Sequence, residues 1–498
     1  MFTKSQPDEI ESYLVDASLM RGGRAARVVF PETSEEVAEV LATAAREGTP
    51  VTVAGAGTGI VGGRVPLGGT VLATERLNRI ERVVREATGG YAVAGAGVVL
   101  VDFQRAVADQ GLIYPPDPTE WSCYLGGSVA TNASGARTFK YGATRNYIRR
   151  LKIALTTGDL LDLRRGQIHA DAEGNLRIPL APGRIINARL PSYRMPQTRK
   201  HASGYFVAPG MDALDIFIGS EGTLGVITEV EAQLLPLAEN VLSGVVFFRT
   251  EENLLAFVGE ARASSLETRE RAQAGGLDAR ALEYFDKESL RFLRRKYSLI
   301  PNWAAGALFF EQETSAATEE HLMTEWLALL ERHDALLDDS WFATGEADRR
   351  RMLEFRHQLP VLVNEWLARH GQRKVSTDMA VPDSAFAGVL SFYKETLRSS
   401  GLQYVIFGHI GDNHVHVNIL PRDDREAARA REIYLEFVRR VVALQGTISA
   451  EHGIGKLKRE YLRLLYGDEH LREMAALKRA FDPAAILGRG NIFAEEFL

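Results

Sequence analysis

The sequence predicts a protein of mixed helices and strands in two or more structural units. With 498 residues, the chain is longer than one domain of ordinary size. Residues 27–54 have the pattern of a strand, a helix and a second strand. Residues 403–420 have the pattern of two strands joined by a tight turn. A mixed fold follows from these two patterns.

The composition is that of a globular protein with a large core. Hydrophobic residues make up 45% and the formal net charge is −6, so nothing indicates nucleic acid or an anionic membrane as a partner. Cys123 is the only cysteine, which excludes an internal disulfide, zinc finger or iron–sulfur cluster. No apolar run approaches the roughly 18 residues that span a bilayer, and the N-terminus lacks a signal-peptide pattern. We expect a cytoplasmic protein, with any membrane contact made through a partner.

The first strand–helix–strand unit leads into a glycine-rich loop. Arg27–Phe30 is the expected strand, Thr33 or Ser34 can cap the helix, and Gly48 can end it. After the strand VTVA, the segment GTGIVG matches GxGxxG, which in a dinucleotide fingerprint opens a helix. Seven glycines between residues 55 and 69, with a proline, exclude a helix here. The loop can still bind a phosphate through backbone N–H groups, or it can be a series of tight turns.

A second segment of small residues, GGSVATNASGA, lies within residues 114–155. The prolines of YPPDP force an extended chain before it. Residues this small let the backbone approach a large flat ligand, and they equally suit a tight contact between a helix and a sheet. The residues alone do not decide between these two roles.

Three of the eleven histidines lie in the stretch FGHIGDNHVHVNI. With Gly411-Asp412-Asn413 as a tight turn, the flanking strands form a hairpin. His414, His416 and Asn418 then share one face of the second strand, and the hairpin folds His409 back toward that face. Two imidazoles come within reach of one metal ion. The alternative is that each histidine is a hydrogen-bonded structural residue.

A carboxylate and another imidazole stand side by side in TISAEHGIGK, after a long predicted helix. Adjacent residues point in different directions, so of Glu451 and His452 one can bind a metal while the other faces a substrate. Two imidazoles and one carboxylate, with an open position, form a metal site suited to catalysis.

Eight segments occur in a characteristic order: VAGAGTGIVGGRVPLGG, YPPDP, LGGSVATNASGARTFKYG, GSEGTLGVITE, KVSTDMAVP, FGHIGDNHVHVNI, TISAEHGIGK and FDPAAILGRGNIF. In this order they resemble the FAD-linked oxidases of the vanillyl-alcohol oxidase / p-cresol methylhydroxylase superfamily. The branch they resemble contains the D-lactate, D-2-hydroxyglutarate and glycolate dehydrogenases. The resemblance covers the chain from about residue 27 to its end.

The resemblance implies an α+β fold with two lobes. Residues 1–236 would form an FAD-binding domain of the p-cresol methylhydroxylase (PCMH) type. Residues 237–420 would form an α+β cap domain, with an antiparallel sheet flanked by helices, that binds the substrate. Residues 421–498 would form a C-terminal helical segment that returns to the FAD domain and completes the active site.

The resemblance also implies FAD as cofactor, with the loop at residues 55–59 holding its pyrophosphate. The implied cofactor-binding residues are Gly55, Ala56, Gly57, Thr58, Gly59, Pro116, Asp117, Gly126, Gly127, Asn132, Gly135, Tyr141, Gly142, Gly222, Thr223, Ile227 and Asn491. The chain departs from the family at Ala54, often Arg in relatives, at residues 123–125 and at residues 488–490. No pattern identifies a covalent flavin link.

For the metal and the substrate, the resemblance implies specific side chains. His409, His416 and Glu451 would bind a divalent metal, zinc in most relatives, and His452 would be the catalytic base. Arg356, Lys374 and Asn418 would bind the substrate, although the two cations could also be ordinary surface charge. His414, often Asn in relatives, receives no role. Pro360 replaces a Thr of the D-2-hydroxyglutarate branch, which weakens a dicarboxylate assignment.

The implied activity is oxidation of a D-2-hydroxy acid, such as D-lactate, to a 2-oxo acid, with hydride transfer to flavin N5. Electrons would pass to a cytochrome, a quinone or an electron-transfer flavoprotein rather than to NAD, and a homodimer remains open. One alternative is different chemistry on the same fold, as in an alditol oxidase or an alkylglycerone-phosphate synthase. Another is a non-catalytic or electron-relay subunit of a glycolate-oxidase-type complex.

Overall fold

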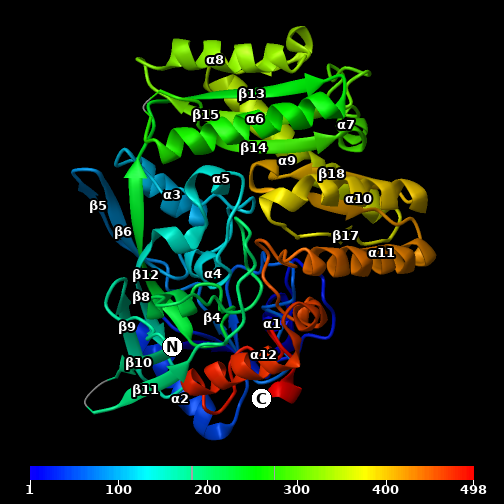
Figure 1. Cartoon of the computed structure of the whole chain (residues 1–498). Coiled ribbons are helices and arrows are strands. Elements are labelled where there is room, and N and C mark those ends of the chain that lie inside the picture. Colours follow the sequence, from blue (N-terminus) through cyan, green and yellow to red (C-terminus); the bar gives the residue numbers. More distant parts are fainter. Residues whose placement is uncertain (181–182, 274) are drawn as a thin grey trace.

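Two lobes, each built on its own sheets, make up the protein, and the C-terminal helices lie alongside both (Figure 1). The computed structural model describes residues 1–180, 183–273 and 275–498. Among these residues the first lobe contains strands β1–β12 and the second contains β13–β19. The predicted α+β fold with two lobes, an antiparallel cap sheet and C-terminal helices is confirmed.

The first lobe combines a four-stranded sheet, in the order β1-β2-β4-β3, with a six-stranded sheet centred on β12 and a separate β10–β11 hairpin. Its strands are β1 (Phe2–Lys4), β2 (Arg27–Phe30), β3 (Val51–Ala54), β4 (Thr70–Ala73), β5 (Ile80–Glu86), β6 (Gly89–Gly95), β7 (Leu112–Ile113), β8 (Ile148–Ala154), β9 (Leu160–Arg164), β10 (Asn175–Pro179), β11 (Ile185–Arg189) and β12 (Val226–Pro236). Its helices are α1 (Pro7–Ile10), α2 (Ser34–Glu47), α3 (Leu100–Ala108), α4 (Leu125–Ala130) and α5 (Thr138–Tyr141).

Helix α2 forms where the sequence predicts it. The Thr33 side chain accepts a hydrogen bond from the Glu36 N–H and caps the N-terminus. Gly48 ends the helix in the left-handed conformation, with φ 66°. The glycine-rich segment after β3 contains no helix, so the rejection of a dinucleotide fingerprint is confirmed.

The second lobe is built on one antiparallel sheet in the order β16-β13-β15-β14-β18-β19-β17. Its strands are β13 (Asn240–Phe248), β14 (Ala279–Asp286), β15 (Gly306–Thr314), β16 (Trp341–Phe342), β17 (Val375–Ser376), β18 (Tyr404–Gly408) and β19 (His416–Ile419). Its helices are α6 (Glu251–Glu270), α7 (Lys287–Leu293), α8 (Glu319–Arg332), α9 (Glu346–Arg369) and α10 (Phe386–Ser400).

Side chains of this sheet alternate between two helical layers. Val246 and Phe248 belong to the core cluster that contains buried residues of α6 and α8. Val245 and Phe247 belong to the cluster that contains buried residues of α7 and α9. Strand β14 alternates in the same way, so the odd-numbered residue Phe285 faces α9. The face of β14 toward α9 also contributes to the candidate site.

The predicted hairpin of β18 and β19 is confirmed, but its predicted turn is wrong. The strands pair antiparallel, with Phe407 opposite His416 and Val405 opposite Asn418. Their connection is longer than a tight turn and contains a 3₁₀ turn at Ile410–Asp412, followed by Asn413 with φ 52°. The second strand therefore begins at His416, and His414 lies before it.

The C-terminal segment runs back from the second lobe to the first (Figure 1). Its helices are α11 (Asp424–Ala443) and α12 (Arg459–Phe481), the latter interrupted at Gly467. After α12 the chain lies along β3, because the Val51 N–H donates to the Ile486 carbonyl and the Gly488 N–H to the Val51 carbonyl. The end of the chain thus lies next to the glycine-rich loop. Within the described residues, no helix is both long enough and apolar enough to cross a bilayer.

Candidate active site

A cavity of about 550 Å³ lies where the two lobes and the C-terminal segment meet. Its first-lobe wall contains the glycine-rich loop, α4 and the turn before β12, and its second-lobe wall contains residues of β14, α9 and the β18–β19 hairpin. The predicted site residues that line it are Gly55, Ala56, Gly57, Thr58, Gly59, Gly126, Gly127, Gly222, Ile227, Arg356, Lys374, His409, His416, Asn418, Glu451 and His452. Three distant parts of the sequence therefore share one cavity.

The other predicted cofactor residues lie outside the cavity wall: Pro116, Asp117, Asn132, Gly135, Tyr141, Gly142, Thr223 and Asn491. Several of them have structural contacts. A Cβ on Gly135 would lie 1.8 Å from the Asp117 carbonyl oxygen, so this close approach requires glycine. The Tyr141 hydroxyl donates to Glu313 of the second lobe. Asn491 donates to the Gly63 carbonyl at 2.9 Å and so supports the glycine-rich loop from outside the cavity.

The small-residue segment combines a tight packing contact with open space in the cavity wall. A Cβ on Gly126 would lie 2.5 Å from the Ala96 Cβ, so this glycine permits a tight contact between α4 and the end of β6. A Cβ on Gly127, one residue on, would meet nothing within 4 Å, and Gly127 lines the cavity. One glycine thus serves packing and its neighbour leaves room for a ligand.

The glycine-rich loop is shaped for a ligand that contacts backbone. Gly57 has φ 81°, which favours glycine, and Arg64 Nη1 donates to the Gly55 carbonyl at 3.0 Å. A Cβ on Gly59 would meet nothing within 4 Å. The loop backbone is therefore accessible from the cavity, as phosphate binding through N–H groups requires. These features fit a flavin dinucleotide along the first-lobe wall.

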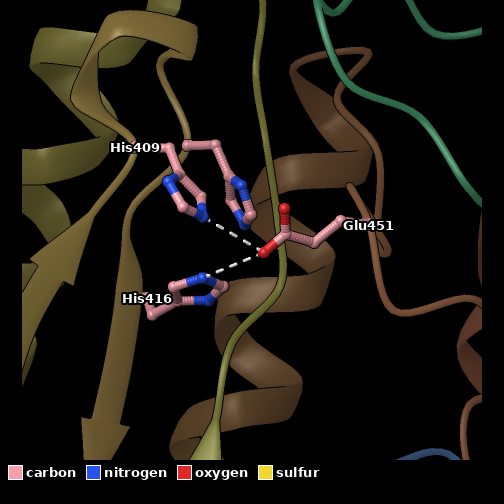
Figure 2. A group of neighbouring side chains, drawn as sticks. His409, His416 and Glu451 are labelled. Atoms are coloured by element: carbon pink, nitrogen blue, oxygen red, sulfur yellow. Dashed lines mark hydrogen bonds and ion pairs between the residues drawn. The ribbon is translucent and has the colours of Figure 1, made fainter. Parts of the chain in front are cut away.

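Two imidazoles face one carboxylate oxygen at the second-lobe wall (Figure 2). Nε2 of His409 and Nε2 of His416 each lie 3.3 Å from Oε1 of Glu451. Each of these residues offers one ligand atom in a group, with His414, whose ligand atoms all lie within 4.8 Å of one another. The predicted trio is thus brought together by the hairpin and by the segment after α11.

The hydrogen bonds of the two Nδ1 atoms, which point away from Glu451, determine the tautomers of His409 and His416. Nδ1 of His409 lies 2.7 Å from a carboxylate oxygen of Glu283, and Nδ1 of His416 lies 3.0 Å from the Thr377 carbonyl. Because these oxygens can only accept, both Nδ1 atoms donate, and a neutral ring presents a lone pair on Nε2. With both rings neutral, two lone pairs and a carboxylate oxygen point at one another, an arrangement that a proton or a metal cation between them stabilises. The donor set fits a divalent metal.

The charges around His409 support the same conclusion. Burial disfavours its charged form, but the carboxylates of Glu283 and Glu451 outweigh burial and raise the pKa of His409 to about 9. The surroundings thus favour positive charge on this imidazole, which either a proton or a metal ion can provide.

The second oxygen of Glu451 is held by the first lobe. Oε2 accepts hydrogen bonds from Lys200 Nζ and from Ser134 Oγ, both at 3.1 Å. Lys200 is buried and also donates to the Gly135 carbonyl at 2.9 Å. These contacts leave Oε1 as the oxygen that faces the two imidazoles. Neither Lys200 nor Ser134 was predicted: Ser134 lies in one of the eight segments that carry the family resemblance, and Lys200 lies outside all of them.

Asp378, also not predicted, anchors the loop that carries Glu451 and His452. Its carboxylate accepts the backbone N–H of Glu451 at 3.2 Å and that of His452 at 3.0 Å. Lys458 Nζ donates to the same carboxylate at 2.7 Å. His414 Nε2 lies 3.3 Å from it, and burial lowers the pKa of His414 to about 3. His414 is therefore a neutral, buried ring that packs against His409 and His416.

His452 lies beside the trio and lines the cavity. Its ring stacks on His416 at a centroid distance of 5.5 Å and an interplanar angle of 9°. Nδ1 is 3.3 Å from Asp378, while Nε2 is 3.8 Å from Glu451 Oε1. Burial lowers the pKa of His452 to about 4 although Asp378 opposes this effect, so the ring is neutral at pH 7.

The two predicted cations line the same wall but differ in their surroundings. Arg356 on α9 donates through Nε to Glu283 at 3.0 Å. Lys374 has no hydrogen-bond or ion-pair partner among the described residues, and burial lowers its pKa. The amide of Asn418 is buried and equally unpartnered within the described chain. The cavity therefore offers an uncompensated ammonium and a free amide to a ligand.

Comparison with known proteins agrees with this geometry. The family model described as "FAD binding domain" matches residues 25–164. The family model described as "FAD linked oxidases, C-terminal domain" matches residues 249–492. D-lactate dehydrogenase of Archaeoglobus fulgidus is 30% identical over 477 residues, 93% of this chain and 90% of that protein. Glycolate oxidase subunit GlcD of Bacillus subtilis is 28% identical over 495 residues, 97% and 92% of the two chains.

One more relative in sequence and one solved structure are also similar to this chain. D-2-hydroxyglutarate dehydrogenase of Xanthomonas citri pv. viticola is 28% identical over 511 residues, 98% of this chain and 94% of that protein. A solved structure of alkyldihydroxyacetonephosphate synthase superposes with a TM-score of 0.66 at 17% identity, covering 98% of this chain and 82% of the other. That likeness concerns the fold alone.

The fold and the cavity are those of a flavin-binding oxidoreductase. The chain belongs to the FAD-linked oxidases, in the branch that contains proteins named D-lactate dehydrogenase, D-2-hydroxyglutarate dehydrogenase and GlcD.

Proposed function

We propose that this protein is an FAD-dependent dehydrogenase that oxidises a D-2-hydroxy acid, such as D-lactate, to the 2-oxo acid. The observation that carries the proposal is the content of one cavity. The His409–His416–Glu451 trio, the uncompensated Lys374 and the accessible glycine-rich loop all line it. Such a cavity can hold a flavin, a cation and a carboxylate next to one another.

In this proposal the residues at positions 55–59, 126, 127, 222 and 227 hold the FAD directly, and the eight outer residues support them. His409, His416 and Glu451 hold a divalent metal, which we assign as zinc because nitrogen and carboxylate ligands with an open position suit it. When bound, FAD supplies a hydride acceptor at N5, and the metal supplies a Lewis acid for the substrate hydroxyl.

The remaining steps belong to side chains of this chain. Lys374 and Arg356 bind the substrate carboxylate, and the Asn418 amide orients the substrate between them and the trio. His452 accepts the hydroxyl proton, because its neutral ring faces the cavity beside the trio.

Several broader features also remain proposals. We infer domain boundaries after residues 236 and 420, a cytoplasmic location and an electron acceptor other than NAD, such as a cytochrome, a quinone or an electron-transfer flavoprotein. A second candidate function is that of a flavoprotein subunit in a glycolate-oxidase-type complex, which the similarity to GlcD favours.

One experiment tests the proposal and separates these candidates. The isolated protein is mixed anaerobically with matched D- and L-2-hydroxy acids, and the flavin absorbance is followed. Rapid bleaching by a D-acid, with much slower bleaching by its L-enantiomer, supports the dehydrogenase. A flavin that stays oxidised with every acid in the isolated chain, but is reduced in the presence of partner subunits, supports the subunit instead.

A further inference from the structure

We propose that Glu283 is a positioning residue that orients the metal site and the carboxylate clamp together. This inference rests on the proposed function, because it assigns Glu283 a role toward both a metal and a substrate. Oε1 of Glu283 is the partner of His409 Nδ1 at 2.7 Å, and Oε2 is the partner of Arg356 Nε at 3.0 Å. One carboxylate thus orients a residue of each group.

The sheet register explains how Glu283 reaches both residues. In the antiparallel pair of β14 and β18, Tyr284 lies opposite Gly408, so Glu283 lies beside His409 at the end of β18. The odd-numbered residues of β14 face α9, as Phe285 does by packing against Phe355. Arg356 follows Phe355 on that helix. The two hydrogen bonds of Glu283 therefore connect β14 with the end of β18 and with helix α9.

Only a carboxylate can make both contacts. Glu283 is 3% exposed, and each oxygen has a different donor. A glutamine of the same shape would present its NH₂ group to one of these donors and leave it unpaired. With Glu283, the His409 ring is held with Nε2 toward Glu451. Nε of Arg356 is occupied by Glu283 and Nη1 lies 3.2 Å from His357 Nε2, so Nη2, which has no hydrogen-bond partner among the described residues, is the nitrogen left for a ligand in the cavity.

The protein contains a matched control on the next strand. Glu311 of β15 is also buried and accepts from Arg280 Nε at 3.0 Å and Nη2 at 2.8 Å. Neither Glu311 nor Arg280 lines the cavity. Glu311→Gln therefore removes the negative charge of a buried Arg–Glu pair in the same sheet, at a residue that does not line the cavity.

The test compares E283Q with E311Q in the FAD-loaded protein. Zn²⁺ affinity is measured by competition with a chelator. KM and kcat are measured with D-lactate or D-2-hydroxyglutarate, whichever the wild type oxidises faster. E283Q should bind Zn²⁺ about 10- to 100-fold more weakly, the usual effect of losing the outer partner of a metal-binding histidine. It should also raise KM about tenfold or more, while E311Q leaves both values at those of the wild type.

A double-variant cycle separates positioning from a general loss of structure. In an R356A background, E283Q should no longer change KM, because its clamp partner is gone, while the loss of Zn²⁺ affinity should persist. If E283Q does not fold, Glu283→Asp replaces it, since the shorter side chain cannot reach both donors and should show the same two losses.

The proposal is overturned if E283Q keeps wild-type Zn²⁺ affinity and KM, or if E311Q shows the same losses as E283Q. In both cases a wild type that binds Zn²⁺ and oxidises a hydroxy acid leaves the proposed function standing. A wild type that does neither overturns the proposed function, and the role of Glu283 with it.

Discussion

Lys374 carries a charge in the cavity that no described side chain neutralises, and burial lowers its pKa. An ammonium in such a place binds an anion strongly, because the competing solvation by water is reduced. Glu451 and His452 are adjacent and both line the cavity, but Oε1 of Glu451 faces two imidazoles while the His452 ring lies between Asp378 and the stacked His416. At the residue scale, the charge of Lys374 and the directions in which the Glu451 and His452 side chains point distinguish the proposed roles of these three residues.

Lys374→Ala should raise KM for the 2-hydroxy acid about ten- to a hundredfold, the equivalent of roughly 1.5–3 kcal/mol for a charge-assisted contact. FAD content and metal content should not change, because Lys374 contacts neither proposed group. Steady-state kinetics with a metal assay measure both outcomes. The exposed neighbour Arg373 provides the control, and Arg373→Ala should behave as the wild type. Equal KM values in all three proteins would place the clamp elsewhere.

His452→Ala should keep FAD and metal but lose about 10²–10⁴ in kcat, the usual contribution of a general base. Glu451→Ala should instead lose the metal, because it removes the oxygen that both imidazoles face. Metal analysis and single-turnover flavin reduction distinguish the two variants. If metal is lost from His452→Ala and retained in Glu451→Ala, the two roles are reversed.

At the scale of single elements, α4 shows how one short helix serves both packing and ligand binding. Its glycines 126 and 127 both line the cavity, but an added Cβ would meet Ala96 at the end of β6 at position 126 and open space at position 127. The β18–β19 hairpin shows a similar division, since Nε2 of His409 and of His416 lies near Glu451 while Nε2 of the buried His414 lies near Asp378. In both elements the direction of each side chain decides its role.

Gly126→Ala should destabilise the protein, because the new methyl group would lie 2.5 Å from the Ala96 Cβ. Overpacking of this kind typically costs about 1–3 kcal/mol. Gly127→Ala should leave the Tm of the FAD-free protein unchanged and weaken FAD binding, because its methyl group enters the cavity. Thermal unfolding and FAD titration measure the two effects. A lower Tm for both variants, with unchanged FAD affinity, would show that α4 only packs.

At the scale of the whole molecule, the site is assembled from both lobes and the C-terminal segment. Oε1 of Glu451 faces histidines of the second lobe, whereas Oε2 accepts from Lys200 and Ser134 of the first lobe. The contact between the lobes and the geometry of the trio are therefore coupled. The proposed metal and flavin positions nevertheless use different residues.

Prolonged dialysis against a chelator should remove about one divalent metal per chain and abolish oxidation of the hydroxy acid. The flavin spectrum should remain, because no residue of the trio belongs to the first-lobe wall that is proposed to hold FAD. Adding Zn²⁺ should restore the activity. A metal-free protein with full activity would show that the histidines act through hydrogen bonds or proton transfer alone.

The sequence by itself determined the local elements of this protein. The Thr33 cap, the Gly48 end of α2, the irregular glycine-rich loop and the β18–β19 hairpin depend on short-range propensities and hydrogen bonds, which a sequence displays directly. The resemblance to the FAD-linked oxidases added the order of the segments and the predicted site residues, most of which line the cavity.

Only the tertiary structure decided which residues meet. Glu283 lies 126 positions from His409, and Lys200 lies 251 positions from Glu451, so their contacts depend on sheet register and on the docking of the lobes. Which glycine faces the cavity, and where the second strand of the hairpin begins, depend on the same long-range packing. Such contacts leave no periodic pattern in a sequence, because the physical cause lies in distant segments that pack only in the folded chain.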